Sequence, residues 1–410
     1  MEDKEKEGAV SMQEISEKNT EKKGISREFI LVIVLAGLLL TLSFLCWLKK
    51  EDDFSENERR VLAKFPEISV KSLLEGDFME AFESYSLDQF PMRDTFREIK
   101  ALSSYYIFGN KANNGIYIED GYLSKMEYPM NPEMLDYAAS HMEKIYDSYL
   151  KPYNSKCYFT IVPDKNFFLA KEKGYLAMDY EELFAYMKEK VYFTEYVDIT
   201  GYLSLEDYYK TDTHWRQEKI VDVAEYLKFV MGNNTLDIGL DEDVNSDNYM
   251  EENNNDINKY EVRKFDTPFY GVYCGQSALP VKPDDLYYLN SSILENCKVS
   301  SYDTGKPVNS VIYNMDKARG KDAYELFLSG TSALQVIENP NASGRKELLV
   351  FRDSFGSSLI PLLVDEYSKI TVIDTRYVNS SLLGNMVDFH GQDTLFLYST
   401  LVLNNSMSMH

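Results

Sequence analysis

"KELLVFRDSFGSSLIPLLVDEYSKITVIDTRY", residues Lys346–Tyr377, is the best-patterned segment of the chain. Its apolar run, tight turn, amphipathic run and second apolar run predict a strand, a turn, a helix and a strand. The segment "DTLFLYSTLVL", Asp393–Leu403, supplies a further buried strand. Strand–helix–strand units of this kind are parallel and right-handed in nearly all sheets. We therefore predict a parallel sheet in the C-terminal part of the chain.

Upstream of this segment, helical and strand-like patterns alternate. "NNGIYIEDGYLSKM" places two glycine turns around a β-rich triplet, which predicts a hairpin. Two helix–strand pairs follow, "PEMLDYAASHMEKIYDSYLKPY" with "KCYFTIVPDK" and "DYEELFAYMKEKV" with "YVDIT". An amphipathic helix, "QEKIVDVAEYLKFVM", then ends at Gly232. This alternation predicts an α/β fold, with a central sheet and helices packed on its faces.

A long apolar segment stands near the N-terminus. Residues Phe29–Leu48, "FILVIVLAGLLLTLSFLCWL", are 20 residues without a charge, which is the length needed to span a bilayer. The basic residues that crowd its N-terminal side are Lys18, Lys22, Lys23 and Arg27. On the other side, acidic residues soon follow Lys49 and Lys50. The positive-inside tendency then places the N-terminus in the cytoplasm and residues 51–410 outside.

A signal peptide or a lipid anchor would account for the apolar segment less well than a membrane span. A cleaved signal peptide has a shorter apolar run and an A-x-A-like site, which "FLCWLKK" lacks. A lipid-modified Cys46 would follow small residues, but Phe44 and Leu45 precede it. We therefore predict an uncleaved signal anchor, with a single span in the cell membrane and an extracytoplasmic domain.

The sequence predicts an organisation in four parts. These are a disordered cytoplasmic tail (1–28), a transmembrane anchor (29–48), a juxtamembrane linker with helices (49–100) and an extracytoplasmic domain (101–410). Within the domain, residues 236–260 break the pattern and predict a long acidic loop. The run Asp241–Glu252 half-fits a Ca²⁺ loop, but Ser246 stands where the sharp turn needs glycine. We predict no metal site there.

The composition excludes some partners. The net charge of −24 argues against nucleic acid and anionic lipid, because phosphate binding needs clustered Lys and Arg. Three cysteines lie beyond the apolar segment, and their wide spacing supports neither a disulfide framework nor a zinc site, although it leaves one bridge open. Cys157, in "CYFTIV", is predicted to be a small core residue. No cofactor is predicted.

Ser354 stands where a predicted strand, "LLVF", ends and a predicted helix, "GSSLIPLLVDEY", begins. Ligands bind at this place in open α/β sheets. Free N–H groups at the start of a helix can stabilise an oxyanion, so Ser354 is a candidate nucleophile. The alternative is that Ser354 or Asp353 simply caps the helix.

"YYKTDTHWRQ", Tyr208–Gln217, holds the best candidate for a base. A serine nucleophile needs a base, and the base needs an orienting group. In an extended segment Asp212 and His214 project to one side, so the carboxylate can accept from one ring nitrogen while the other points to substrate. The remaining histidines, in less suitable settings, are His141, His390 and His410. The alternatives are a surface pair without a role and, weaker still, a metal site that lacks a second histidine at ligand spacing.

Together these residues carry a resemblance to a known family. "YYKTDTHW", "LLVFRDSFGSSLIPLLVDEY" and "ITVIDTRY" are similar to the AlgJ/AlgX-type, or DHHW, family of extracytoplasmic SGNH-hydrolase-like proteins linked to acetylation of exported polysaccharides. Smaller landmarks extend the resemblance over residues 55–400: "ERRVLAKFP", "QFPMRD", "DGYL", "VPDK" and "TPFYG". The resemblance implies a flavodoxin-like three-layer domain with a mostly parallel sheet.

The resemblance also implies roles for single residues. Ser354 would take the acetyl group, His214 would be its base and later its acid, and Asp212 would orient His214. The Ser354 N–H is expected to stabilise the oxyanion. Further oxyanion or substrate contacts are expected from Trp215, Gly330, Arg352 and Arg376, with a purely structural role as the alternative for both arginines. The chain departs from the family pattern at Thr213, where the DHHW branch has His, and at Glu218-Lys219, where Gly-Ala is usual.

The implied function is that of a membrane-anchored O-acetyltransferase. Such an enzyme moves acetyl groups onto hydroxyls of an exported or cell-surface polysaccharide through an acetyl-serine intermediate. The implied partner is a membrane-bound O-acyltransferase that supplies acetyl groups from the cytoplasmic side. One alternative is an acetylesterase that uses the same triad. Another is a non-catalytic glycan-binding subunit of an envelope assembly.

Overall fold

The computed structural model describes residues 26–232, 256–303, 305–342 and 344–410. The predicted tail, except its last three residues, the calcium-like run Asp241–Glu252 and most of the predicted acidic loop lie outside the described residues. The chain divides into two compact units, one made of Met1–Ser55 and Val61–Phe96 and the other of Glu56–Arg60 and Arg97–His410. Each unit is described by itself.

The first unit is helical. Helix α2, Arg27–Leu48, begins at Ser26, whose hydroxyl accepts from the Phe29 N–H at 3.3 Å. Its stretch Arg27–Cys46 is long and apolar enough to cross a membrane, with a mean hydropathy of 2.9. The short elements that follow in this unit are β1 (Phe54–Ser55), α3 (Val70–Glu75) and α4 (Asp77–Asp88). Strand β2 (Arg60–Val61) and helix α5 (Arg93–Tyr106) each contain residues of both units. The break between α4 and α5 contains Pro91.

The second unit is built on an eight-stranded sheet. Its strands, in spatial order, are β11 (Val308–Ser310), β10 (Lys298–Ser301), β12 (Leu334–Glu338), β14 (Lys369–Ile373), β13 (Glu347–Arg352), β15 (Asp393–Ser399), β6 (Cys157–Val162) and β7 (Glu195–Tyr196). Strands β14, β13, β15, β6 and β7 pair in parallel, and β12, β10 and β11 continue the sheet antiparallel. The predicted mostly parallel sheet is confirmed. The strand predicted from "YVDIT" is reduced to the two residues of β7.

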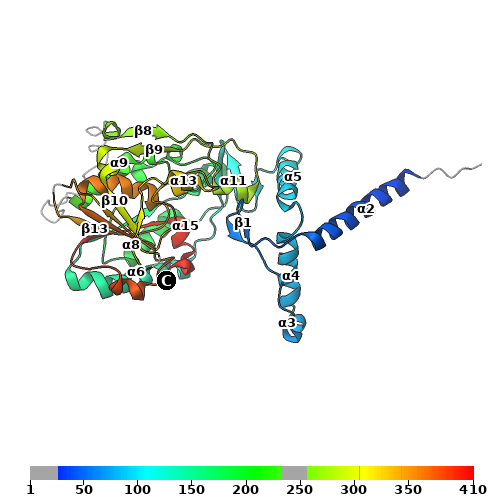
Figure 1. Cartoon of the computed structure of the whole chain (residues 1–410), viewed down its shortest axis with the longest axis horizontal. Helices are drawn as coiled ribbons and strands as arrows, with labels where there is room; N and C mark the ends of the chain where they lie inside the picture. The colour runs from blue at the N-terminus through cyan, green and yellow to red at the C-terminus, as the bar shows by residue number, and fades with distance from the viewer. Residues whose placement is uncertain (1–25, 233–255, 304, 343) are drawn as a thin grey trace, which may run out of the picture. The chain divides into compact units, whose positions relative to one another are not determined.

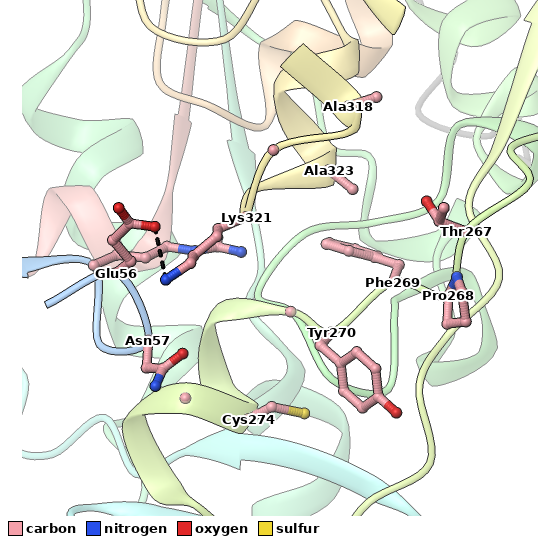
Figure 2. A pocket seen from close by; sticks show the side chains of 14 residues that line it. Glu56, Asn57, Thr267, Pro268, Phe269, Tyr270, Cys274, Ala318, Lys321 and Ala323 are labelled. Carbon is pink, nitrogen blue, oxygen red and sulfur yellow. Dashed lines mark ion pairs between the residues drawn. The ribbon is translucent and has the colours of Figure 1, made fainter. Parts of the chain in front are cut away.

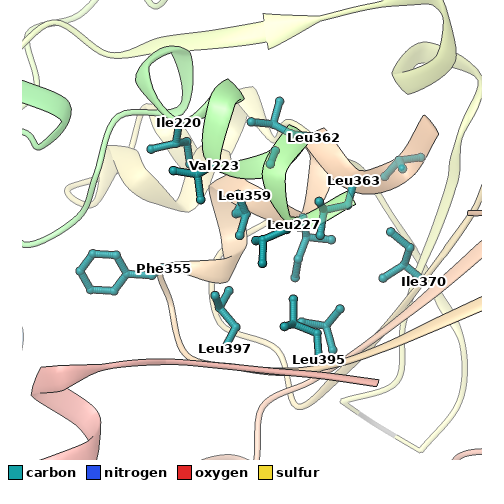
Figure 3. Close-up of a cluster of buried hydrophobic side chains, with 14 of the residues drawn as sticks. Ile220, Val223, Leu227, Phe355, Leu359, Leu362, Leu363, Ile370, Leu395 and Leu397 are labelled. Carbon is teal, nitrogen blue, oxygen red and sulfur yellow. The ribbon is translucent and has the colours of Figure 1, made fainter. Parts of the chain in front are cut away.

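Helices cover both faces of this sheet, because successive strand residues project to opposite sides. On β13, Leu348 and Val350 enter one apolar core, and Leu349 and Phe351 enter the other. The first core, part of which is drawn in Figure 3, contains α9 (Val221–Gly232), α14 (Gly356–Leu359) and a 3₁₀ helix (Ile360–Glu366). The second contains α6 (Pro132–Ile145) and α8 (Tyr180–Lys190), and Figure 1 shows α6 and α9 on opposite sides of the sheet. The predicted three-layer α/β architecture is confirmed.

The helix after Ser354 differs from the prediction in its second half. It is α-helical only over Gly356–Leu359 and continues as a 3₁₀ helix from Ile360. Pro361 has no N–H to donate to the carbonyl four residues earlier, so the α-helical hydrogen bonding stops there.

The remaining described elements surround the sheet. The predicted hairpin is present as an antiparallel group of β3 (Ala112–Asn113), β4 (Ile116–Glu119) and β5 (Tyr122–Lys125). Asn114-Gly115 and Asp120-Gly121 make its turns with positive φ. The others are α7 (Lys165–Lys173), β8 (Glu261–Lys264), α11 (Val272–Ser277), β9 (Tyr287–Asn290), α12 (Ser292–Asn296), α13 (Met315–Ala318) and α15 (Thr400–Leu403).

A buried carboxylate joins the C-terminal ends of the neighbouring strands β6 and β15. Asp164, two residues after β6, accepts hydrogen bonds from the Thr400 hydroxyl at 2.7 Å and from the Asn166 N–H at 2.8 Å. The Tyr180 hydroxyl of α8 also donates to it, at 2.9 Å. Burial raises the pKa of the Asp164 carboxyl to about 6, against the opposing effect of these donors.

This pKa predicts a pH-dependent contribution to stability. The folded chain takes up a proton on Asp164 between about pH 6 and pH 4, where the unfolded chain does not, so this group stabilises the fold increasingly as the pH falls through that window. Asp164→Asn removes the titration. Relative to the parent chain, we expect the free energy of unfolding of this variant to be lower by about 2 kcal/mol more at pH 4 than at pH 7, because only the parent gains stability from the proton on Asp164.

Denaturant unfolding at the two pH values measures this difference. Asp316→Asn, at a fully exposed carboxylate, is the matched control and should show no such change between the two pH values. A difference between Asp164→Asn and the parent chain that is the same at both pH values contradicts the prediction.

Candidate active site

The Asp-Thr-His motif lies at the tip of a tight loop. Tyr208 and Trp215 pair as an antiparallel bridge at its base, and the Tyr209 N–H donates to the His214 carbonyl at 3.0 Å. Asp212 therefore stands in the turn of the loop and His214 on its returning arm. Because the loop is closed by backbone hydrogen bonds, both side chains have fixed starting points.

Three side chains that are far apart in the sequence meet at this tip. His214 Nδ1 lies 2.5 Å from Asp212 Oδ1, and His214 Nε2 lies 2.8 Å from Ser354 Oγ. Asp212 is fully buried, His214 is 6% exposed and Ser354 is half-buried. A hydroxyl bonded to an imidazole, whose other nitrogen contacts a buried carboxylate, is the arrangement that activates serine for attack on an acyl group.

The indole of Trp215 fastens the loop to the segment that carries Ser354. Its Nε1–H lies 3.0 Å both from the Phe355 carbonyl and from the Ser358 hydroxyl oxygen. The Gln217 side chain adds a 2.8 Å bond to the Ser358 carbonyl. Trp215 is completely buried, and its N–H is engaged within the protein and not turned toward an oxyanion or substrate. Its contacts are those of a residue that positions the loop.

Asp353, the residue before Ser354, takes the capping role that was the alternative for these two residues. Asp353 Oδ1 accepts from the Phe355 N–H at 2.9 Å, and Oδ2 accepts from the Ser399 N–H at 2.7 Å. The Ser354 hydroxyl is therefore left to face His214. Within the described part of the chain the Ser354 N–H has no hydrogen-bond acceptor, so it is available to an oxyanion.

The Asp212 carboxylate is held by donors on its second oxygen as well. Oδ2 accepts from the Val272 N–H at 2.8 Å and lies 3.6 Å from Arg59 Nη1. Burial acts to raise the pKa of this carboxyl, but His214, Arg59 and the Val272 N–H together bring it below its ordinary value. The group is therefore an ionised acceptor with a fixed orientation.

A tyrosine covers one face of the imidazole. The ring of Tyr324 stacks on that of His214, with centroids 3.8 Å apart and planes 5° apart, and its hydroxyl lies 2.8 Å from Ser358 Oγ. Asp322 caps the short helix that carries Tyr324 and pairs with Arg59 at 2.8 Å. The sequence alone predicted no role for Arg59 or Tyr324, although Arg59 lies in the landmark "ERRVLAKFP".

A buried charge, Lys165, and a half-buried one, Asp284, hold the base of the loop. Lys165, in the landmark "VPDK", donates from Nζ to the Tyr209 carbonyl at 2.8 Å, and burial lowers the pKa of its ammonium group to about 8. Asp284 accepts from the Thr211 N–H at 2.7 Å and from the Thr211 hydroxyl at 2.6 Å. The Tyr209 carbonyl and the Thr211 N–H, which the loop does not pair internally, are thus satisfied by side chains from other elements.

The other residues predicted to contact an oxyanion or the substrate have partners within the protein. The Gly330 N–H donates to the Phe327 carbonyl at 3.0 Å in a turn, so it is not free to bind an oxyanion. The Arg352 side chain is 2% exposed and lies 3.8 Å from Asp374. Arg376 forms a two-pronged pair with Asp374, at 2.9 and 2.7 Å. Both arginines thus lie beside Asp374, in keeping with the purely structural role that was given as the alternative.

The described residues contain no group of three or more His, Cys, Asp or Glu side chains placed to hold a metal ion. All four cysteines are free thiols, so the one disulfide left open by the sequence is not formed. Cys157 is buried in the core, as predicted.

The chain matches a family model described as DHHW protein over residues 206–373. This match confirms the resemblance to the DHHW family. The matched segment contains Asp212, His214 and Ser354. A comparison with curated protein sequences found no match.

Solved structures share the fold. A DHHW family protein from Eubacterium siraeum is 19% identical, with 72% of this chain and 95% of that chain covered and a TM-score of 0.55. Bacillus cereus PatB1 is 16% identical, with 70% and 96% covered and a TM-score of 0.53. PatB1 with a sulfonyl adduct is 17% identical, with 70% and 94% covered and a TM-score of 0.53. The predicted SGNH-hydrolase-like α/β fold is confirmed, and at these identities the likeness concerns the fold alone.

Gly271, in the landmark "TPFYG", offers a direct test of how closely the site is packed. A Cβ on Gly271 would lie 2.3 Å from Asp212 Cβ and 2.4 Å from Asp212 Cα. Gly271→Ala therefore has to displace the backbone of the Asp-Thr-His loop. Misplacing a reacting group by about 1 Å costs roughly 100-fold in rate, so we expect a loss of that order in p-nitrophenyl acetate hydrolysis by the purified chain.

Gly201→Ala is the matched control. A Cβ at Gly201 meets no atom within 4 Å, so this variant should keep the parent rate. Full activity in Gly271→Ala would mean that the loop adapts freely, contrary to the packing described.

Proposed function

We propose that the chain is a membrane-anchored O-acetyltransferase that moves acetyl groups onto hydroxyls of an exported or cell-surface polysaccharide. The 2.8 Å contact between His214 Nε2 and Ser354 Oγ carries the proposal, because it joins a base to a nucleophile. The choice of acetyl as the transferred group and of a polysaccharide as the acceptor is inferred from the resemblance to the AlgJ/AlgX-type, or DHHW, family. An apolar N-terminal helix that is long enough to span a bilayer supports the anchor.

The proposed reaction has two halves. In the first, His214 takes the proton of the Ser354 hydroxyl while Oγ bonds to the acetyl carbonyl carbon. The leaving group of the donor departs with that proton and leaves acetyl-Ser354. In the second, an acceptor hydroxyl gives its proton to His214 while its oxygen bonds to the acetyl carbon, and the released Ser354 oxygen takes the proton back. Asp212 stabilises the imidazolium in both halves.

The charge that develops on the carbonyl oxygen needs donors of its own. The Ser354 N–H is the first candidate, since it begins a turn and has no acceptor among the described residues. The donor of acetyl is expected to be a membrane-bound O-acyltransferase, because acetyl groups are activated in the cytoplasm and the domain is proposed to lie outside. No cofactor is required by this reaction.

Substitution of the three side chains tests the chemistry. Ser354→Ala and His214→Ala should abolish acetyl transfer, and Asp212→Asn should lower its rate by about 1,000- to 10,000-fold, because the imidazole loses its orienting charge. PatB1 has been solved with a sulfonyl adduct, and sulfonyl fluorides are a fitting probe here too. After treatment with phenylmethanesulfonyl fluoride, mass spectrometry should find a phenylmethanesulfonyl group on Ser354 of the parent chain, with fluoride as the leaving group, and none on this residue in His214→Ala.

Two further measurements distinguish acetyl transfer from hydrolysis and from a non-catalytic binding role. Release of acetate that is unaffected by an oligosaccharide acceptor identifies an acetylesterase with the same triad. Unaltered polysaccharide acetylation in cells that carry Ser354→Ala identifies a non-catalytic glycan-binding subunit. Retained melting temperatures show that each variant is folded.

Fractionation of cells tests the anchor. The full chain should stay with membranes through an alkaline carbonate wash, and protease added to spheroplasts should digest residues 51–410, because the helix spans the bilayer with its N-terminus inside. A chain that lacks residues 1–48 should be released into the soluble fraction. A mature N-terminus found after Leu48 would instead identify a cleaved signal peptide.

A further inference from the structure

A cavity of about 390 Å³ borders the candidate site. Two of its lining residues, Arg59 and Gly271, are also neighbours of Asp212, the first as an ion-pair partner and the second in backbone contact. The volume lies within the range of small-molecule sites in proteins, about 300–1,000 Å³. The cavity is drawn in Figure 2.

Three segments form its walls. They are the stretch around Asn57, the stretch from Thr267 to Gly275, and the stretch from Ala318 to Ala323. The first two walls are in tight contact, because a Cβ on Gly275 would lie 1.7 Å from the Asn57 carbonyl oxygen. Gly271 holds the second wall against Asp212 in the same manner. The cavity is therefore preformed, and its position relative to Asp212 is fixed.

One wall of the cavity carries a large, exposed aromatic ring. Tyr270 is 57% exposed and lines the cavity, while its neighbour Phe269 is 1% exposed and packs beneath. Figure 2 shows Tyr270 on one side of the opening and the Glu56–Lys321 pair across from it. An exposed aromatic face next to hydrogen-bonding groups suits a ligand that has both apolar C–H faces and polar edges.

The charges around the cavity are already paired. Lys321 Nζ lies 2.7 Å from Glu56 Oε2, and Arg59 Nη1 lies 2.8 Å from Asp322 Oδ2. A charged ligand would have to break one of these pairs, whereas an uncharged hydroxyl can bond to either member without separating it. Thr267 and Asn57 add further polar groups to the lining. The chemistry favours a neutral, polyhydroxylated ligand.

We propose that this cavity binds an uncharged sugar residue of the acceptor glycan, with Tyr270 as its stacking platform. The proposal rests on the proposed function and assigns it a substrate subsite. A polymeric acceptor extends beyond the hydroxyl that reacts, so a cavity whose lining residues Arg59 and Gly271 contact Asp212 receives a neighbouring residue of the same glycan. The cavity then selects for long, neutral acceptors.

Isothermal titration calorimetry on the full chain in detergent tests this directly. The probes are three neutral hexasaccharides (cellohexaose, chitohexaose and mannohexaose) and one acidic oligomer, hexagalacturonate. We expect at least one neutral hexasaccharide to bind more tightly than hexagalacturonate. Tyr270→Ala should raise its Kd about tenfold, whereas Tyr270→Phe, which keeps the ring, should change it little. Tyr153→Ala, at a tyrosine that is 52% exposed elsewhere, is the matched control and should bind as the parent does.

Three results would overturn the proposal: no neutral hexasaccharide binds, hexagalacturonate binds best, or Tyr270→Ala binds as tightly as the parent chain. Labelling of Ser354 by phenylmethanesulfonyl fluoride in the same preparation keeps the two proposals apart. Labelling without sugar binding rejects the cavity and leaves the acyl chemistry standing. Sugar binding without labelling rejects the acyl chemistry and leaves the cavity standing as a sugar site.

Discussion

One indole N–H holds the two halves of the candidate site together. Trp215 Nε1 lies within 3.0 Å of both the Phe355 carbonyl and Ser358 Oγ, and these groups belong to the segment that begins with Ser354. A histidine and a serine that are 140 residues apart meet at 2.8 Å only if the loop and the strand end are fixed against each other. The indole supplies that constraint from a fully buried position, where the loss of a hydrogen bond is most costly.

Three of the five short landmarks scattered along the chain share one physical role, because each supplies a residue that contacts this loop. "VPDK" contributes Lys165, which donates to the Tyr209 carbonyl, and "TPFYG" contributes Gly271, which lets the backbone approach Asp212. "ERRVLAKFP" contributes Arg59, which places a cation beside the Asp212 carboxylate. Each landmark is remote in sequence from the Asp-Thr-His motif. Each is used to position the motif, so the site depends on residues that carry no chemistry themselves.

The layers of the fold were predictable because the signals are local. The apolar runs of β13 and β15 and the helical periods of α6, α8 and α9 appear directly in the sequence. The pairing of Asp212 with His214 is also local, since the two residues are only two positions apart, although they lie in a tight turn and not in the extended segment that was predicted. Their meeting with Ser354 was predicted from the resemblance and not from periodicity. The failures were long-range: whether Gly330 has a free N–H, or Trp215 is buried, depends on partners that no window of sequence contains.

Arg59 makes the triad and the neighbouring cavity a single electrostatic unit. Its guanidinium lies 3.6 Å from Asp212, 2.8 Å from Asp322, and in the lining of the cavity. Asp322 in turn caps the helix whose Tyr324 stacks on the imidazole. In a buried setting the attraction between charges at these distances is several times stronger than in water. A ligand that shifts Arg59 therefore changes the electrostatic field at Asp212, the carboxylate that contacts the His214 imidazole. The acceptor side of the proposed reaction is in this way physically connected to the base that deprotonates the acceptor.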